Sequence, residues 1–107
     1  MNGQFVIIEG VVGCNAQGFS VRRHPRYDGQ DRYFAYIGLR DGARLIWQEI
    51  EMSHEQIGQN NKVLTGGNMV RVSGWLKKQL GVPLYRVQVD SVHLICTAQT
   101  TALRKAA

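Results

Sequence analysis

Short runs in which apolar and polar residues alternate dominate the chain, and they predict strands. The first run, FVIIEGVVG, spans residues 5–13, is rich in β-branched residues, and is too short and glycine-broken for a helix. Gly10 inside this run indicates a bulge or a sharp bend. A later run, MVRVSGWL at residues 69–76, alternates strictly and has Gly74 at the corresponding position. Both runs are therefore predicted to be strands that bend.

The middle of the chain predicts a hairpin. Asp41-Gly42 is a turn dipeptide between two strand-like runs, YFAYIGLR and LIWQEIEM. One phase of the second run is predicted to face the core, and it holds Ile46, Ile50 and Met52. The other phase is predicted to face solvent or a ligand, and it holds Leu45, Trp47, Glu49 and Glu51.

A short helix and a last strand follow. Ser53 with Gln56 resembles a capping box, so a helix of one or two turns is predicted to start there. The run LYRVQVDSVHLI alternates again, with a phase shift near Asp90. Residues 97–107 carry no core pattern, and we expect them to be a short flexible tail.

These elements predict an all-β fold. Five strands with glycine bends, long first and last loops and a short helical segment between strands 3 and 4 are typical of a closed five-stranded Greek-key barrel, the OB-fold, over residues 1–96. An SH3-like barrel would have shorter connections and no helix before the fourth strand. A small sandwich fragment is the other alternative.

Composition sets the class of protein. The 107 residues fit one globular domain, with 44% hydrophobic and 20% charged residues. No apolar stretch approaches the roughly 20 residues of a membrane span, and the N-terminus lacks a signal-peptide pattern, so we expect a cytoplasmic protein without a membrane partner. Cys14 and Cys96 have no metal-binding companions and are expected to be buried thiols; a disulfide between them is the alternative.

Residues 18–33 are the candidate binding segment, and Pro25 and Gly29 indicate that it is a loop. Binding of a single nucleic-acid strand needs cations along the phosphates and rings on which bases stack, and guanidinium can serve both needs. The segment offers as candidate phosphate contacts and stacking rings Arg22, Arg23, Arg26, Arg32, Phe19, Tyr27 and Tyr33. The alternative is a solvated loop whose rings pack on the barrel, which Asp28 and Asp31 favour.

Two tryptophans on strands add to this surface. Trp47 is on the non-core phase of the third strand, but Glu49 and Glu51 share that phase and count against nucleic acid. Trp75 shares a face with Arg71 and Lys77, a more favourable setting. A subunit interface is the alternative role for either ring. The loop between the last two strands is bracketed by candidate phosphate contacts at Lys77, Lys78 and Arg86.

The sequence argues against an enzyme. His24, His54 and His93 lack metal-ligand spacing, and no nucleophile–base pattern is present. The GGN at residues 66–68 lacks the lysine and helix of a phosphate-binding loop. We therefore expect no catalysis, no metal and no cofactor, and a net charge of +5 is compatible with an acidic partner.

Three stretches resemble bacterial single-stranded DNA-binding proteins. NMVRVSGWL and, after a loop, YRVQVDSVHLI resemble the fourth and fifth strands of that family, and FVIIEGVV is similar to its first strand, so the likeness covers about residues 5–95. The chain departs from the family in its basic ending ALRKAA, where a long acidic-tipped tail is usual, and in the tight turn RDGAR. This short form resembles the primosomal replication protein N (PriB) branch.

The resemblance implies a homodimer that binds single-stranded DNA in replication or replication restart, with a helicase or other primosome proteins as partners. Two alternatives stay open. One is an OB-fold protein-interaction module of a replication complex with weak nucleic-acid affinity. The other is an RNA-binding barrel, against which the absence of clustered aromatic RNA signatures counts.

Overall fold

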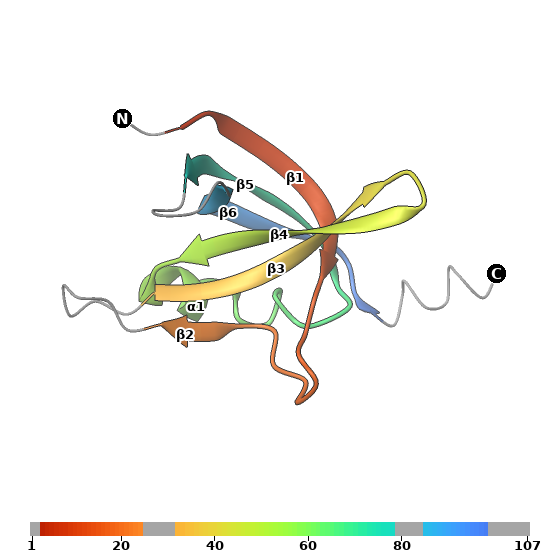
Figure 1. Ribbon diagram of the computed structural model, residues 1–107. Coiled ribbons are helices and arrows are strands. Elements are labelled where there is room, and N and C mark those ends of the chain that lie inside the picture. Colours follow the sequence, from red (N-terminus) through yellow and green to blue (C-terminus); the bar gives the residue numbers. More distant parts are fainter. Residues whose placement is uncertain (1–2, 25–31, 79–84, 99–107) are drawn as a thin grey trace.

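The computed structural model describes residues 3–24, 32–78 and 85–98. The elements in these ranges follow the order β1 (Phe5–Val12), β2 (Arg22–His24), β3 (Arg32–Asp41), β4 (Arg44–Met52), α1 (His54–Asn60), β5 (Met69–Lys78) and β6 (Tyr85–Cys96). Figure 1 shows β1 curving across the barrel, with the tip of the β3–β4 hairpin projecting beyond it. The described part contains no helix long and apolar enough to cross a membrane.

The strands close into a barrel. Their order in the sheet is β1-β5-β6-β4-β3-β2, and β1 also pairs with β3 through Val11 and Val12. All pairings are antiparallel except that of β4 with β6, which joins Ile50 to Val87 and Glu51 to Gln88. The five long strands form the predicted Greek-key OB-fold barrel, with α1 between its third and fourth strands. The predicted fold class is confirmed.

A bulge bends β5 and β6 together. Ser73 pairs with Ser91 but the next residue, Gly74, pairs with Val89, so Asp90 is the extra residue of β6. This bulge explains the phase shift that the sequence has near Asp90. Strand β1 also curves, as Figure 1 shows, and near its end it pairs with β3 as well as with β5.

The core lies inside the barrel. Its fully buried side chains come from all five long strands and from the segment after α1, and the largest are Val12, Ile37, Ile50, Met52, Leu64, Val70, Val72 and Val87. The core phase predicted for β4 is right for Ile50 and Met52 and wrong for Ile46, which is 47% exposed. Ile46 follows the same phase, but it pairs with Leu39, beyond the residues of β3 that pair with β1, and so lies on the part of the hairpin past the closure of the barrel.

Helix α1 begins with the predicted capping box. The Ser53 hydroxyl accepts from the backbone N–H of Gln56, and the Gln56 side chain accepts from the backbone N–H of Ser53. The amide of Gln56 also donates to the carbonyl oxygen of Val89 in β6, at 2.6 Å. Ile57 packs against the core cluster, so α1 is tied to the barrel on two sides.

The basic segment is only partly a loop. Arg22–His24 form the short strand β2, which pairs with the first residues of β3, so the prediction of no regular structure is wrong there. The physical reason is an open edge, since β1 pairs with β3 only at Ile37 and Gly38 and leaves the start of β3 available. Arg26 and Tyr27 lie outside the described residues.

Candidate nucleic-acid interface

The outward side of the β3–β4 hairpin carries Trp47 together with further aromatic and charged side chains. Directly opposed residues of antiparallel strands share a face, and the outward pairs are Phe34 with Glu51, Tyr36 with Glu49, and Gly38 with Trp47. Arg22 of β2 is opposite Phe34 and extends the same face. We call these residues the β3–β4 face.

The indole ring of Trp47 packs against the backbone of two glycines, Gly13 and Gly38. A Cβ atom placed on Gly13 would lie 2.8 Å from Cζ3 of the indole, and one placed on Gly38 would lie 2.9 Å from the same atom. Only glycine at both positions leaves room for the ring. The side chain is still 51% exposed, so it presents an open aromatic surface, as predicted from its strand phase.

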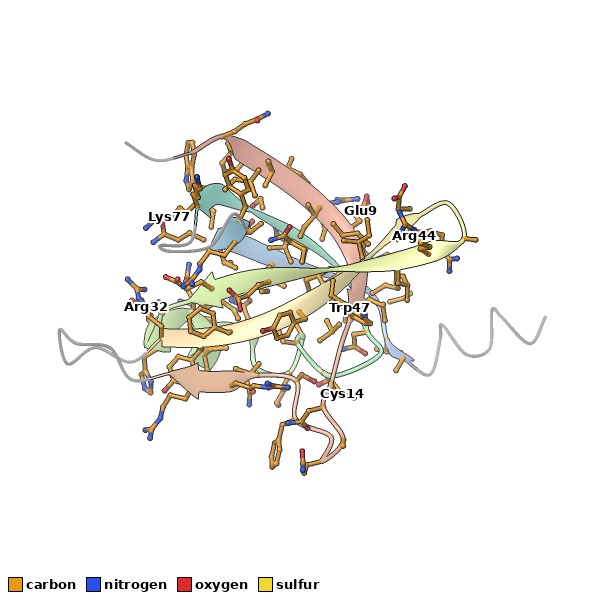
Figure 2. All side chains as sticks on the ribbon, viewed as in Figure 1. Glu9, Cys14, Arg32, Arg44, Trp47 and Lys77 are labelled. Atoms are coloured by element: carbon orange, nitrogen blue, oxygen red, sulfur yellow. The ribbon has the colours of Figure 1, made fainter. Side chains whose placement is uncertain are left out.

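A pocket of about 230 Å³ opens beside Trp47. Its wall includes the rings of Phe19 and Tyr36 and the side chains of Arg22 and Cys14. Figure 2 shows Cys14 below Trp47, while Arg32 and Lys77 lie at the opposite end of the barrel. Phe19 is 65% exposed. Together with Tyr36 and Trp47, it makes three aromatic side chains that line one pocket.

Glu51 is buried, contrary to its predicted solvent-facing position. Arg86 Nη1 donates to Glu51 Oε2 at 2.7 Å, and Arg32 Nε lies 3.7 Å from Glu51 Oε1. Arg86 Nε lies 3.5 Å from Glu49 Oε2, and the Arg86 guanidinium stacks 5.0 Å above the ring centroid of Phe34. The two arginines cover the carboxylate, whose side chain is 4% exposed.

This arrangement changes the electrostatic balance of the face. Glu49 and Glu51 count against nucleic acid when only the strand phase is known, but both have a cation within ion-pair distance. The same contacts occupy Arg32 and Arg86, so these two arginines are less available to phosphate than the exposed Arg22. Arg22 makes no ion pair with any described residue.

Tyr36 is fixed by its neighbour. Its hydroxyl donates to Glu49 Oε1 at 3.1 Å. Burial raises the pKa of Tyr36 above its ordinary value of 10.0, and the hydrogen bond and negative charge of Glu49 raise it further against the opposing charges of Arg22 and Arg86. The phenol therefore stays protonated at neutral pH and keeps its ring in place within the pocket.

Tyr33 faces away from this surface. Its ring packs against the core cluster, and its hydroxyl lies 2.9 Å from Nδ1 of His54 at the start of α1. Arg23, opposite Tyr33 in β2, has an exposed side chain. The structure thus places the two rings that begin β3 on opposite sides: Tyr33 points inward, and Phe34 is on the outward side but is buried, with the Arg86 guanidinium over its ring.

A second group lies on the outer side of β1 and β5. The rings of Phe5 and Trp75 meet edge to face at a centroid distance of 4.9 Å, and Trp75 is 39% exposed. Arg71 pairs with Glu9 at 3.5 Å, with both side chains about half exposed. Lys77 and Lys78 end β5 and are exposed, as expected for the borders of the last loop.

Cys14 and Cys96 do not form a disulfide, and the prediction that both are buried is wrong, because Cys14 is exposed and Cys96 is only partly buried. Phe34, Tyr36 and Cys14 were not identified as site residues from the sequence. The run that begins β3 is apolar in both phases, so its pattern does not reveal which rings point outward. Among the described residues, no three His, Cys, Asp or Glu side chains gather as a metal site requires.

No protein-family model and no curated protein matches the chain by sequence. Solved structures match it by shape. The mitochondrial single-stranded DNA-binding protein Rim1 of S. cerevisiae superposes with a TM-score of 0.71 at 17% identity, covering 90% of this chain and 99% of that one. The small single-stranded DNA-binding protein of Streptomyces coelicolor gives a TM-score of 0.62 at 14% identity, over 88% and 94% of the two chains.

A domain of another protein gives a similar match. The dimeric N-terminal domain of PriB from Thermoanaerobacter tencongensis superposes with a TM-score of 0.64 at 14% identity, over 85% of this chain and 94% of that one. Identities this low show a shared fold. The likeness expected from the strand motifs is confirmed at that level: this chain shares its OB-fold with single-stranded DNA-binding proteins and with the PriB N-terminal domain.

Proposed function

We propose that the protein is a non-enzymatic, largely sequence-independent binder of single-stranded DNA. The observation that carries the proposal is Trp47, a half-exposed indole held against main chain on a face that Arg22 extends. Stacking on a ring tolerates any base, because every base has a π-face. The solved structures named above as single-stranded DNA-binding proteins support the same function.

The proposed contacts fall into three groups. Exposed cations flank the two tryptophans, and arginines that now pair with carboxylates can reach phosphate by exchanging partners. Arg26 and Tyr27 lie outside the described residues and stay candidate contacts from the basic segment. The proposed interface consists of Arg22, Arg23, Arg26, Tyr27, Arg32, Trp47, Arg71, Trp75, Lys77, Lys78 and Arg86. Tyr33 is left out because its ring packs against the core cluster.

A titration with oligo-dT, followed by tryptophan fluorescence at several salt concentrations, tests this function. We expect quenching, with log affinity falling by about 0.7 per phosphate contacted for each tenfold rise in salt. Trp47→Ala is expected to weaken binding by about 5- to 150-fold, the range that one lost base stack covers. Trp47→Phe keeps a ring and serves as the matched control, with most of the affinity retained.

Two results would contradict the proposal. Equal affinity for a duplex of the same length would show that stacking on Trp47 does not contribute to binding, since paired bases cannot reach the ring. No binding to oligo-dT even at low salt would leave the alternative, an OB-fold interaction module of a replication complex.

We also propose a homodimer, supported by an apolar strip along the edge of the barrel. Phe5 and Ile7 on β1 are 42% and 63% exposed, and Trp75 lies beside them. Within the described residues, β1 pairs over residues 5–9 on one side only, with β5. An open apolar edge strand invites pairing, and a second copy would cover it. The PriB domain of similar shape is described as dimeric.

Light scattering tests the dimer. The protein is expected to have twice the mass of one chain, and Ile7→Asp is expected to reduce it to that of a monomer because the charge would be buried in the contact. Leu94→Asp, at a residue 45% exposed near the far end of β6, is the matched control and is expected to stay dimeric. A monomeric parent protein would contradict the proposal.

We also propose a place for this binder in replication or replication restart, in the cytoplasm, beside a helicase or other primosome proteins, and the fold that it shares with the PriB N-terminal domain supports this role. To test this role, we would measure the rate at which the restart helicase of the same host unwinds a forked DNA, with and without this protein. An unchanged unwinding rate at saturating protein would count against it.

A further inference from the structure

We propose that Phe19 and Trp47 are the two walls of a pocket that takes one unpaired base, with the adjoining phosphate at Arg22. We call it the base pocket. The inference rests on the proposed function and adds to it a specific subsite on the first loop. The residues that line the hollow, among them Cys14, Phe19, Arg22, Tyr36 and Trp47, all belong to the described part of the chain.

The Phe19 wall is preformed by a turn. Asn15 Oδ1 accepts hydrogen bonds from the backbone N–H groups of Gln17 and Phe19, at 3.0 and 2.9 Å. The backbone N–H of Asn15 donates to the carbonyl oxygen of Phe19 at 2.9 Å, and Gly18 has a φ of +88°. Asn15 and Gly18 are therefore positioning residues, because they fix the loop that carries the ring without contacting a base themselves.

The Trp47 wall is preformed as well, and it is connected to the turn. The indole rests on Gly13 and Gly38, and the backbone N–H of Gly13 donates to the carbonyl oxygen of Tyr36 at 2.9 Å. Since Gly13 leads directly into Cys14 and Asn15, one hydrogen bond holds the base of the turn against β3. Walls that are ordered before binding reduce the entropy lost on binding.

The chemistry of the pocket suits a base with its phosphate. Phe19 and Trp47 supply aromatic surfaces, the hydroxyl of Tyr36 is already used by Glu49, and Arg22 is a cation without an ion-pair partner among the described residues. Two rings around one hollow can contact both sides of a flat base, which only an unpaired base can present. Arg22 can bind the phosphate through two parallel hydrogen bonds.

The reactivity of Cys14 reports whether the pocket is occupied, because this exposed thiol lines it. In a Cys96→Ser background, we would measure the rate at which a maleimide alkylates Cys14, alone and with saturating ligand. Oligo-dT is expected to slow the reaction at least about tenfold. An abasic oligomer of equal length carries the same phosphates without bases, and it is expected to slow the reaction less than about twofold.

Variants test the walls. Phe19→Ala is expected to weaken oligo-dT binding at least about fivefold, the smallest effect of one lost stack. Gly18→Ala strains the turn and is expected to reduce both affinity and protection of Cys14. Gly42→Ala is its matched control, since Gly42 also has a positive φ, of +62°, and neither glycine has an atom within 4 Å of an added Cβ.

The outcomes separate the two proposals. If labelled oligo-dT binds by fluorescence anisotropy but leaves the alkylation rate of Cys14 unchanged, the base pocket is wrong and the proposed function stands. Unchanged affinity in Phe19→Ala, or equal protection by the abasic oligomer, would overturn the base pocket in the same way. No binding of oligo-dT by any measure would overturn the proposed function and the base pocket together.

Discussion

Replacing Gly74 by alanine is expected to lower the free energy of unfolding by about 3 kcal/mol. The added Cβ would lie 2.2 Å from the carbonyl oxygen of Gln88 and 2.9 Å from Cγ1 of Val87, so the two strands must separate at their bulge. The carbonyl belongs to main chain that β6 holds in place, and it cannot rotate away as a flexible side chain would. Urea unfolding followed by circular dichroism measures the loss.

A second glycine provides the control. Gly58 lies within α1, is exposed, and has no atom within 4 Å of an added Cβ. Gly58→Ala is expected to raise the free energy of unfolding by about 0.5–1 kcal/mol, because alanine is the better helix former. Opposite shifts of the two variants would support the close approach of β5 and β6. Equal unfolding midpoints would show that this approach is not tight.

Replacing Glu51 by glutamine is expected to lower the free energy of unfolding by about 2 kcal/mol. Removing one partner of a fully buried ion pair costs about 3–5 kcal/mol. The loss is reduced here because the side chains of Arg32 and Arg86 are each 24% exposed, so water can solvate them. Glu9→Gln is the control, since its pair with Arg71 is half exposed and is worth at most about 0.5 kcal/mol.

The same variant is expected to bind oligo-dT more tightly. Without the carboxylate, Arg32 and Arg86 can bind phosphate instead. Each new phosphate contact steepens the slope of log affinity against log salt concentration by about 0.7. Affinity at low salt and its salt slope measure the gain. If stability falls while both stay unchanged, the two arginines serve the fold and do not belong to the interface.

Much of the fold could be predicted because its decisive features are local. Asp41-Gly42 makes a turn by itself, Ser53 and Gln56 cap a helix within four residues, and Gly74 bends the strand that contains it. Alternation alone does not tell where a strand leaves the barrel. Ile46 therefore follows the core phase of β4 yet lies in solvent.

The site could be predicted only in part, because its contacts join distant segments. The alternation along the strand was enough to predict that Trp47 is exposed. The contact of Arg86 with Glu51, in contrast, joins residues 35 positions apart, which the parallel strands β4 and β6 bring together. No local pattern announces that contact. The packing of the Trp47 indole on Gly13 likewise depends on the path of the chain after β1, where Gly13 lies next to the β3–β4 hairpin.

The seat of Trp47 has a consequence for how such a protein can diverge. The indole packs against the backbone of Gly13 and Gly38, and this part of its support does not depend on the shape of a core side chain. Substitutions among Val12, Ile37 and Ile50 can accumulate and shift stability while the ring stays where it is. Changes at Gly13 or Gly38, in contrast, would alter the position of the ring and the packing of the fold together.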